Sequence, residues 1–170
     1  IADLVSAARD TLAPEAELRE VEVEAPEVES GLQLVSDPDR VLQITLNLLS
    51  NAVKFSPPGS RVGISVRFEE VLDQEAEEVG AGNGGWVVIS VTDEGPGIHP
   101  QDLERIFSEF EQLDTAARQR GTGLGLTLCR NLARHLGGTI QVQSQVGQGS
   151  TFSLWLPAGG EYGGREGWIG

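Results

Sequence analysis

The chain has 170 residues, 39% of them hydrophobic, which suits one folded domain with a single core. Its formal net charge of −14 disfavours nucleic acid and anionic membrane as main partners, because both repel an acidic surface. A single cysteine, Cys129, excludes a disulfide framework. The sequence contains no apolar run close to the ~18 residues needed to span a bilayer, so we expect no direct membrane contact by this domain.

The first half of the chain predicts short elements around one long helix. Apolar residues at helical spacing predict helices at 1–13 and 38–55. Strands are predicted at 18–25, where charged and apolar residues alternate, and at 32–35. Pro14 is expected to end the first helix. Ser36-Asp37-Pro38 is a helix start signal, and Pro57-Pro58-Gly59 ends the long helix.

The second half predicts strands and shorter helices. The strands are expected at 61–68, 86–92, 139–145 and 151–156, and the helices at 100–108 and 123–136. Gly137-Gly138 is a helix stop. The acidic and glycine-rich stretch 69–85 predicts a solvated hairpin, and the glycine-rich end of the chain predicts a disordered tail. This order of elements indicates an α+β fold with helices packed on one face of a mixed sheet.

The long helix carries a narrow polar stripe between broad apolar surfaces. At about 100° per residue, one stripe collects Arg40, Gln43, Asn47, Asn51 and Lys54. Such a stripe faces either water or a polar cavity. Two asparagines one turn apart favour the cavity, because Asn is a poor helix former and its carbonyl oxygen is a suitable magnesium ligand. Lys54 would add positive charge for phosphates.

A carboxylate and two glycines follow the central strand. Asp93 is followed by Glu94-Gly95-Pro96-Gly97-Ile98, so a fixed acceptor lies beside backbone that a ligand can approach closely. An ionised Asp can accept a hydrogen bond from an adenine-type amine. Taken alone, the segment is as consistent with an ordinary turn.

A second glycine-rich segment opens the helix predicted at 123–136. Glycines at a helix N-terminus let phosphate approach unpaired backbone N–H groups, here within Gly121-Thr122-Gly123-Leu124-Gly125-Leu126. Arg118 and Arg120, together with Lys54, would supply local positive charge. The segment follows a loop and lacks a GxxxxGK[ST] pattern, which excludes a dinucleotide fingerprint and a P-loop.

Taken together, these segments resemble the ordered motifs of the ATP-binding catalytic domain of sensor histidine kinases. The matching segments are the N box at 47–56, the first glycine box at 93–97, the F box at 106–110, the second glycine box at 121–126 and the third at 147–152. The resemblance implies a Bergerat fold: an α/β sandwich whose mixed, mostly antiparallel five-stranded sheet carries about three helices on one face. Residues 14–157 would form this domain, 1–13 a connector from an upstream dimerisation hairpin, and 158–170 a tail.

The resemblance also implies a role for each site residue. Asp93 would accept the adenine amine, Asn51 and Asn47 would ligate Mg2+, and Lys54 would lie near the phosphates. Other residues expected around ATP are Phe55, Gly95, Gly97, Ile98, Arg118, Arg120, the segment from Gly121 through Thr122, Gly123, Leu124 and Gly125 to Leu126, and Thr151. Residues 109–122 would form an ATP lid, anchored by Phe107 and Phe110.

The implied activity is phosphoryl transfer to a histidine. Hydrolysing ATPases of this fold carry a glutamate where Asn47 stands, and Asn cannot act as the base for water. His99 precedes a proline and His135 closes a helix, which favours a structural or surface role for each. The resemblance implies that the acceptor histidine lies on a separate dimerisation domain, with a response regulator downstream. We expect a cytoplasmic domain. The alternatives are a serine-directed kinase of the anti-sigma-factor type, a non-enzymatic binding module and a hydrolysing ATPase.

Overall fold

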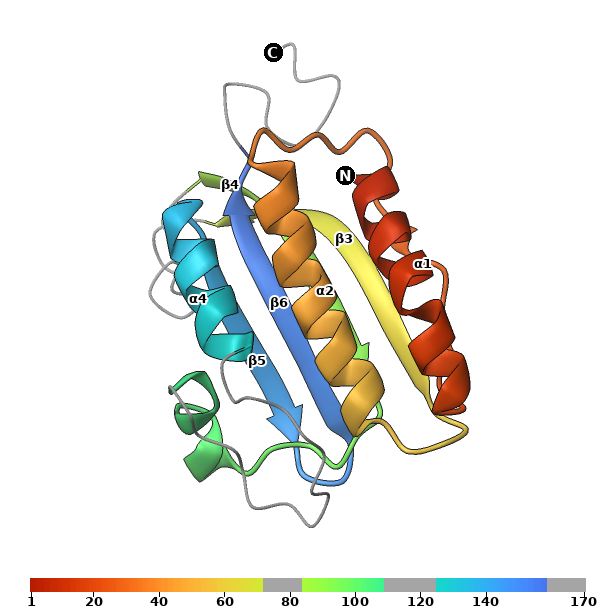
Figure 1. The fold of residues 1–170 in the computed structure, drawn as a ribbon. Helices are drawn as coiled ribbons and strands as arrows, with labels where there is room; N and C mark the ends of the chain where they lie inside the picture. The colour runs from red at the N-terminus through yellow and green to blue at the C-terminus, as the bar shows by residue number, and fades with distance from the viewer. Residues whose placement is uncertain (72–83, 109–124, 159–170) are drawn as a thin grey trace.

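The computed structural model describes residues 1–71, 84–108 and 125–158. The helical elements of these ranges are α1 (Ala2–Leu18), α2 (Pro38–Phe55), α4 (Gly125–His135) and the 3-10 turns η1 (Pro100–Asp102) and η2 (Arg105–Phe107). The strands are β1 (Glu22–Val23), β2 (Glu27–Val28), β3 (Arg61–Val71), β4 (Gly84–Asp93), β5 (Thr139–Gln145) and β6 (Gly149–Pro157). Figure 1 shows α1, α2 and α4 side by side in front of the sheet.

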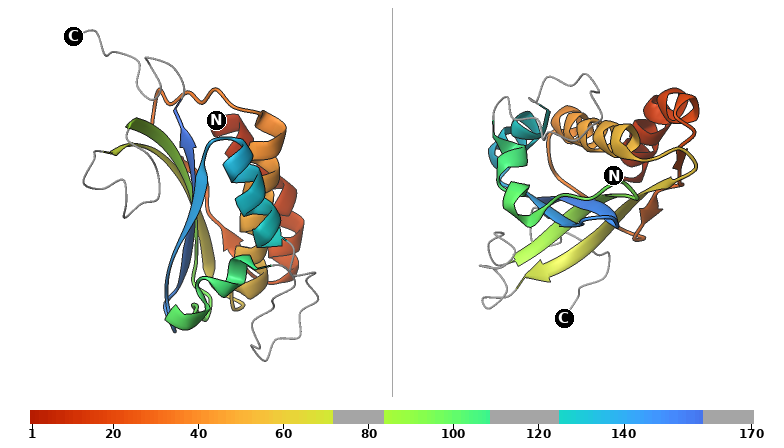
Figure 2. Two further views of the ribbon diagram at one scale, coloured as in Figure 1. Left: turned by 90° about the vertical axis from the view of Figure 1, so that its left-hand side faces the viewer. Right: turned by 90° about the horizontal axis from the view of Figure 1, so that it is seen from below.

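The strands form one mixed sheet in the order β1-β3-β4-β6-β5, and β2 also pairs with β3. Strands β1 and β2 run parallel to β3, whereas the β3–β4, β4–β6 and β5–β6 pairs are antiparallel. Figure 2 shows the twisted sheet edge-on, with α1, α2 and α4 on the same side. The α+β class and the one-sided helix layer predicted from the sequence are therefore confirmed.

The sheet has six strands where five were expected, because its N-terminal edge consists of two dipeptide strands. Glu22 pairs with Arg61, and Glu27 pairs with Ser65 four residues further along β3. Pro26 separates the two pieces and cannot donate a ladder hydrogen bond. The six-stranded count thus reflects one interrupted edge.

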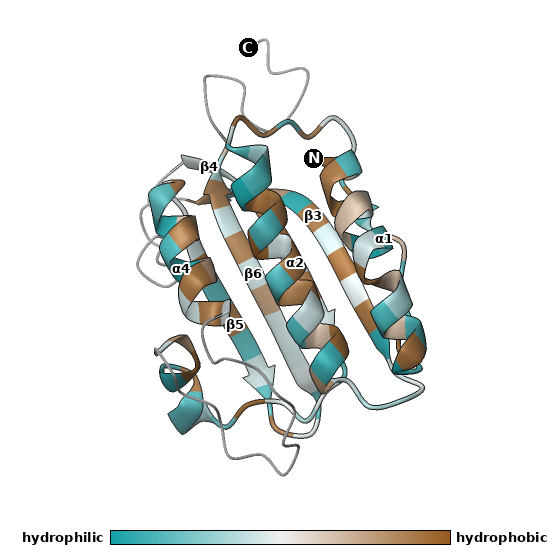
Figure 3. Cartoon of the chain, viewed as in Figure 1, coloured by the Kyte–Doolittle hydropathy of each residue, from teal (hydrophilic) through white to brown (hydrophobic). Residues whose placement is uncertain are grey.

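The core lies between the sheet and the helices α1, α2 and α4, with α2 at its centre. Strand β4 buries Val87, Ile89 and Val91 almost completely, and α2 buries Ile44 and Leu48 against this face. Figure 3 shows apolar and polar residues alternating along β3 and β6, as expected for strands with one covered face. Each fully buried side chain of this size contributes roughly 1.5–3 kcal/mol, so this layer dominates the stability of the fold.

The first helix is longer than predicted, and the expected end at Pro14 is wrong. Helix α1 runs through Pro14 to Leu18. Its buried stripe continues past the proline to Ala16, whose carbonyl also accepts the N–H of Val21 at 2.9 Å. Packing of this stripe in the core outweighs the local cost of proline. The role of residues 1–13 as a connector stays a prediction.

The two strands predicted nearby are also misplaced. The 18–25 strand shrinks to Glu22–Val23, and 32–35 is not a strand, because β-structure forms here only where the backbone reaches β3. The second piece lies instead at Glu27–Val28. Leu32 is still buried in the core, so its side chain packs although its backbone is unpaired in the sheet.

Later elements match the predictions more closely. Strand β3 extends to Val71 and strand β4 begins at Gly84, so the described part of the predicted 69–85 hairpin is strand. Residues 72–83 lie outside the described residues. The helix expected over 100–108 is the pair of turns η1 and η2. The predicted stop after α4 is confirmed by Gly137, with φ of 76°.

The predicted tail begins with a well-placed residue. Ala158 is buried, and its N–H donates to the carbonyl of Gly85 at 2.9 Å. Residues 159–170 lie outside the described part of the chain. Over the ranges that the structure describes, none of the helices has the length and apolarity needed to cross a bilayer.

Candidate functional site

The predicted motifs meet at one end of the molecule. The end of α2, the loop that follows β4, the η1–η2 turns, the start of α4 and the β5–β6 turn all lie at the lower end of Figure 1. Helix α2 and strand β4 run toward this end and α4 starts from it, so segments far apart in the sequence are neighbours here. The candidate site is described below from α2 outward.

Helix α2 begins where the sequence predicts and presents its polar stripe unevenly. The Asp37 carboxylate accepts the N–H groups of Asp39 and Arg40, at 3.1 and 3.2 Å, which caps the helix. The first half of the stripe is exposed, whereas the second half, Asn47, Asn51 and Lys54, is half-buried. The stripe therefore faces water at the start of the helix and forms a sheltered polar surface at its end.

The neighbouring helix α4 supports the sheltered half. The Asn47 side chain is hydrogen-bonded to the thiol of Cys129, which lies wholly inside the core. Burial raises the pKa of Cys129 to about 11, although the hydrogen bond from Asn47 acts in the opposite direction. Cys129 is thus a small, fully buried residue of α4.

The last turn of α2 carries a cation beside an exposed aromatic ring. The Nζ atom of Lys54 lies 5.4 Å from the centroid of the Phe55 ring, and this ring is 44% exposed. A large apolar side chain left this open at a helix end offers a flat surface for another ring. The carbonyl of Phe55 borders Gly95, where an added Cβ would lie 3.0 Å away.

Asp93 is the buried acceptor that the sequence predicts at the end of β4. It is 7% exposed and accepts the N–H groups of Gly95, at 2.8 Å to Oδ1, and of Ser150. Burial raises its pKa above the ordinary value, and these two hydrogen bonds partly oppose the shift. A carboxylate has about four acceptor positions, so two remain for a ligand amine.

The loop after Asp93 is packed tightly against the β5–β6 turn. Gly97 has φ of +71°, and a Cβ there would lie 2.1 Å from the carbonyl oxygen of Gln145. The N–H of Gly147 donates to the carbonyl of Pro96 at 2.7 Å. Only glycine fits position 97, because any side chain would collide with backbone. The first and third predicted glycine motifs thus form one contact surface.

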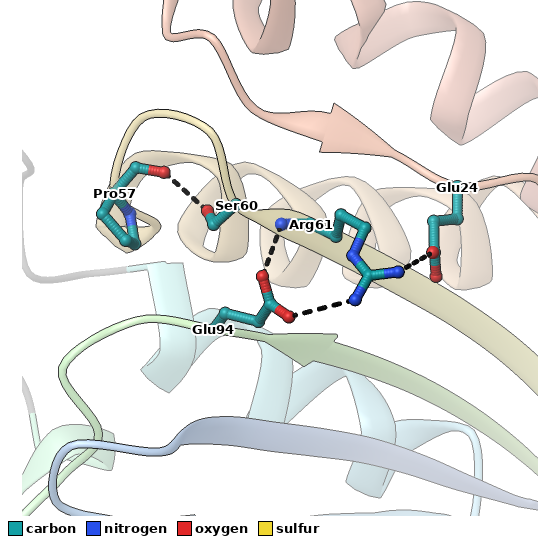
Figure 4. Close-up of polar contacts among 5 residues, drawn as sticks. All are labelled: Glu24, Pro57, Ser60, Arg61 and Glu94. Carbon is teal, nitrogen blue, oxygen red and sulfur yellow. Dashed lines mark hydrogen bonds and ion pairs between the residues drawn. The ribbon is translucent and has the colours of Figure 1, made fainter.

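The other side of this loop is fastened to β3 through Glu94. Its carboxylate accepts the backbone N–H of Arg61 at 2.8 Å and lies 3.6 Å from the guanidinium Nη2. The same guanidinium reaches Glu24 at 3.5 Å, and the Ser60 hydroxyl donates to the carbonyl of Pro57 at 2.6 Å (Figure 4). These charges are exposed, so the ion pairs contribute little to stability, and the loop is held mainly by the hydrogen bond from the Arg61 backbone N–H.

Thr151 lies apart from the other candidate residues that the structure describes. Its hydroxyl is hydrogen-bonded to that of Thr92 at 3.0 Å, on the sheet face opposite the helices. Neighbouring strand residues point to opposite faces, so Ser150, which pairs with Asp93, lies on the helix side instead. Ser150 was missed in the sequence, because without the strand register nothing distinguishes it from Thr151.

Only the last two residues of the second glycine box, at 121–126, belong to the described residues. Gly125 and Leu126 lie in α4, within the helix predicted at 123–136. The other residues expected here lie outside the described residues: Arg118, Arg120, Gly121, Thr122, Gly123 and Leu124, with Phe110 and the expected lid. Phe107 is buried beside α4, where Thr127 donates to its carbonyl at 2.9 Å and the Arg130 guanidinium lies 5.3 Å from its ring.

Both histidines interact with local backbone. The Gln101 N–H lies 3.5 Å from Nδ1 of His99, and Nδ1 of His135 lies 2.7 Å from the carbonyl of Asn131. Both side chains are exposed. In the parts of the chain that the structure describes, no group of three His, Cys, Asp or Glu residues could hold a metal ion.

A polar-striped helix beside a buried Asp and a glycine loop, on one face of a mixed sheet, defines a nucleotide-binding domain of the Bergerat type. The sequence profile of one family matches residues 36–160. The chain belongs to this family, the histidine kinase-, DNA gyrase B-, and HSP90-like ATPases.

Several relatives are histidine kinases. The circadian input-output histidine kinase CikA of Synechococcus elongatus is 43% identical over 124 residues, which cover 72% of this chain and 15% of that protein. The sensor histidine kinase ZraS of Escherichia coli K12 is 36% identical over 154 residues, or 91% of this chain and 29% of that protein. The chain spans less than a third of the length of these two relatives.

Solved structures also match most of this chain. Full-length ShkA in complex with AMPPNP matches with a TM-score of 0.72 and 30% identity, covering 92% of this chain and 30% of that one. The mycobacterial sensor histidine kinase MprB matches with a TM-score of 0.71 and 25% identity, covering 97% and 95% of the two chains.

Proposed function

We propose that this chain is the ATP-binding catalytic domain of a sensor histidine kinase in two-component signal transduction. It binds ATP with Mg2+ and donates the γ-phosphoryl group to a histidine on a separate dimerisation domain. The observation that carries the proposal is the buried carboxylate of Asp93. It lies near the C-terminal end of α2, where the polar stripe has Asn51 and Lys54, in a chain that belongs to this family. The two named relatives, a circadian input-output histidine kinase and a sensor histidine kinase, support it.

The base would bind at the Asp93 end of the site. The carboxylate retains acceptor capacity for the exocyclic amine of adenine, while Gly95, Gly97 and Ile98 line its loop. Exposed Phe55, one turn beyond the asparagines, would flank the base. Because Asp93 is mostly desolvated, a hydrogen bond to it would discriminate more strongly than one at the surface.

The phosphates would lie along the second half of the stripe. Asn51 is half-buried, and its side chain has no hydrogen-bond partner among the described residues, so its amide oxygen is available to a hard cation. Asn51, with Asn47 beside it, would hold Mg2+, which neutralises phosphate charge when bound. Lys54 would add a point charge. Arg118, Arg120 and the segment from Gly121 to Leu126 would surround the phosphates.

The reaction would be transfer to a protein nucleophile, because α2 offers no base for water. Asn47 occupies the position at which a hydrolase would need a carboxylate, and its amide is engaged with the thiol of Cys129. In the transfer, an imidazole nitrogen of the acceptor attacks the γ-phosphorus. A P–N bond forms as the P–O bond to ADP breaks, and ADP leaves with the electron pair.

The acceptor and the next carrier belong to other domains. His99 and His135 interact with local backbone at the surface, which suits neither for the acceptor role. We place the acceptor on a histidine-containing dimerisation domain of the same parent protein, and the onward transfer on a response regulator. The domain would work in the cytoplasm, where ATP is available.

A transfer assay tests the proposal. The chain is incubated with γ-labelled ATP, Mg2+ and the parent's dimerisation domain, and the label on that domain is followed. The account predicts an acid-labile, alkali-stable phosphoramidate that Asn51→Ala abolishes. Gln43→Ala is the matched control, because Gln43 is on the same stripe but at its exposed end, and transfer should be unchanged.

Other products would contradict the proposal in distinguishable ways. An acid-stable phosphoserine on a partner protein would favour the serine-directed alternative. Steady release of phosphate over many turnovers would favour a hydrolase. Transfer that survives Asn51→Ala unchanged would mean that the asparagine is not part of the machinery.

A further inference from the structure

Ser144 is a half-buried residue near the end of β5 that belongs to none of the predicted motifs. Its hydroxyl oxygen lies 2.7 Å from the backbone nitrogen of Ile98, 2.9 Å from the carbonyl oxygen of Gly149 and 2.9 Å from the hydroxyl of Ser150. One small side chain therefore contacts the loop after β4 and two successive residues at the start of β6. All three contacts are within good hydrogen-bond distance.

The proton positions in this cluster follow from the groups involved. A hydroxyl has one hydrogen and two acceptor positions. The Ile98 N–H can only donate and the Gly149 carbonyl can only accept, so Ser144 accepts from Ile98 and donates to Gly149. Its remaining acceptor position receives the hydroxyl hydrogen of Ser150. The hydroxyl of Ser144 is thus fully used, and the cluster has one defined arrangement.

Each partner of Ser144 is directly connected to Asp93. The backbone N–H of Ser150 donates to the Asp93 carboxylate. Gly149 lies against the Asp93 backbone so closely that an added Cβ would be 1.9 Å from its carbonyl oxygen. Ile98 ends the loop that Asp93 begins. Ser144 therefore holds the far end of the loop and the strand start that together surround the carboxylate.

We propose that Ser144 is a positioning residue for base recognition. This inference rests on the proposed function. Its hydroxyl ties the 93–98 loop to the start of β6, and this contact keeps the Asp93 carboxylate oriented toward the adenine amine. Ser144 itself touches no nucleotide. Its effect should be confined to the base end of the site, because its contacts reach the Asp93 side and not the stripe on α2.

Ser153 offers a matched control within the same sheet. Its hydroxyl pairs with that of Ser90 at 2.8 Å, which is the same chemistry between adjacent strands. This pair lies on the sheet face opposite the helices, away from the loop. Ser153→Ala thus removes a comparable hydrogen bond without loosening the surroundings of Asp93. Ser144→Thr is the conservative variant, because it keeps the hydroxyl and suits a strand.

The experiment measures dissociation constants of the chain for ATP and ADP by calorimetry, with Mg2+ present. Ser144→Ala should weaken both nucleotides by about tenfold, the equivalent of one to two hydrogen bonds, and by the same factor. Equal factors are expected because both nucleotides share the base. Ser153→Ala should leave both constants within about twofold of wild type, and Ser144→Thr should restore most of the affinity.

Unchanged affinity in Ser144→Ala, or the same loss in Ser153→Ala, would overturn the inference while leaving the proposed function intact. A loss for ATP alone would also overturn it, because it would place the effect at the phosphates. If wild-type chain bound neither nucleotide, the proposed function itself would fail. Should Ser144→Ala not fold, Ser144→Cys keeps a weaker acceptor and should cost about threefold for both nucleotides.

Discussion

Gly149 is the position where the packing of the site is most sensitive to a single methyl group. It has φ of +101°, and an added Cβ would lie 1.9 Å from the carbonyl oxygen of Asp93 and 2.9 Å from its carbon. Gly147, in the same turn, has φ of +81° but no atom within 4 Å of its Cβ position. The two glycines share the backbone requirement and differ in the close approach.

The expected magnitudes follow from this difference. Alanine in a left-handed conformation costs roughly 1–2 kcal/mol at either position. At position 149, a clash with backbone that must move adds roughly 1–3 kcal/mol. Gly149→Ala should therefore lower the free energy of unfolding by about 2–5 kcal/mol, and Gly147→Ala by about 1–2 kcal/mol. The larger loss is a substantial share of the ~5–15 kcal/mol typical of a domain.

Urea unfolding followed by tryptophan fluorescence measures both variants, because Trp86 and Trp155 are buried in the sheet. The nucleotide affinity of folded Gly149→Ala should fall as well, since the displaced backbone is that of Asp93, whereas Gly147→Ala should bind normally. Equal losses of stability in the two variants would refute the reasoning from close approach. Normal binding in Gly149→Ala would refute the connection to Asp93.

Three further predictions follow. Burial raises the pKa of Asp93 in the folded chain, so the stability that Asp93 contributes is largest when it is protonated and is lost as pH rises through that pKa. In urea unfolding repeated from pH 7 down to pH 4, wild type should therefore gain stability relative to Asp93→Asn. A difference that does not depend on pH would contradict this. With a pKa of about 11 against 9.0, native Cys129 has roughly a hundredfold less thiolate and should react with a thiol reagent only as the chain unfolds, whereas rapid native labelling would mean an open thiol. Glu94→Gln keeps an acceptor for the N–H of Arg61 and loses only the exposed ion pair with its guanidinium, so the free energy of unfolding should change by less than ~1 kcal/mol. A larger loss would show that the charge itself holds the loop.

Features with local causes were predictable from the sequence. Helix α2 starts at its proline because Asp37 caps it, and α4 ends before Gly137 because only glycine readily adopts the left-handed conformation there. Asp93 was found because a carboxylate at the end of a continuous apolar strand stands out. The stripe on α2 was found because helical periodicity places Asn51 and Lys54 together.

Features that depend on tertiary pairing were not predictable. The strand at 32–35 was misplaced because a two-residue strand exists only where it meets β3. Choosing Ser150 over Thr151 requires the register between β4 and β6, which reverses with a shift of one residue. Ser144 has no local signal at all, since its three partners come together only in the folded chain.

The central claim is that Asp93 recognises the adenine of ATP. Calorimetric titration of the 170-residue chain with Mg·ATP and with Mg·GTP tests it most directly. Guanine carries an oxygen acceptor where adenine carries its amine, so it would face the carboxylate acceptor to acceptor. The account predicts saturable binding of ATP and at least about tenfold weaker binding of GTP, a preference that Asp93→Ala removes. Equal affinity for the two nucleotides, or no binding of ATP, would contradict it.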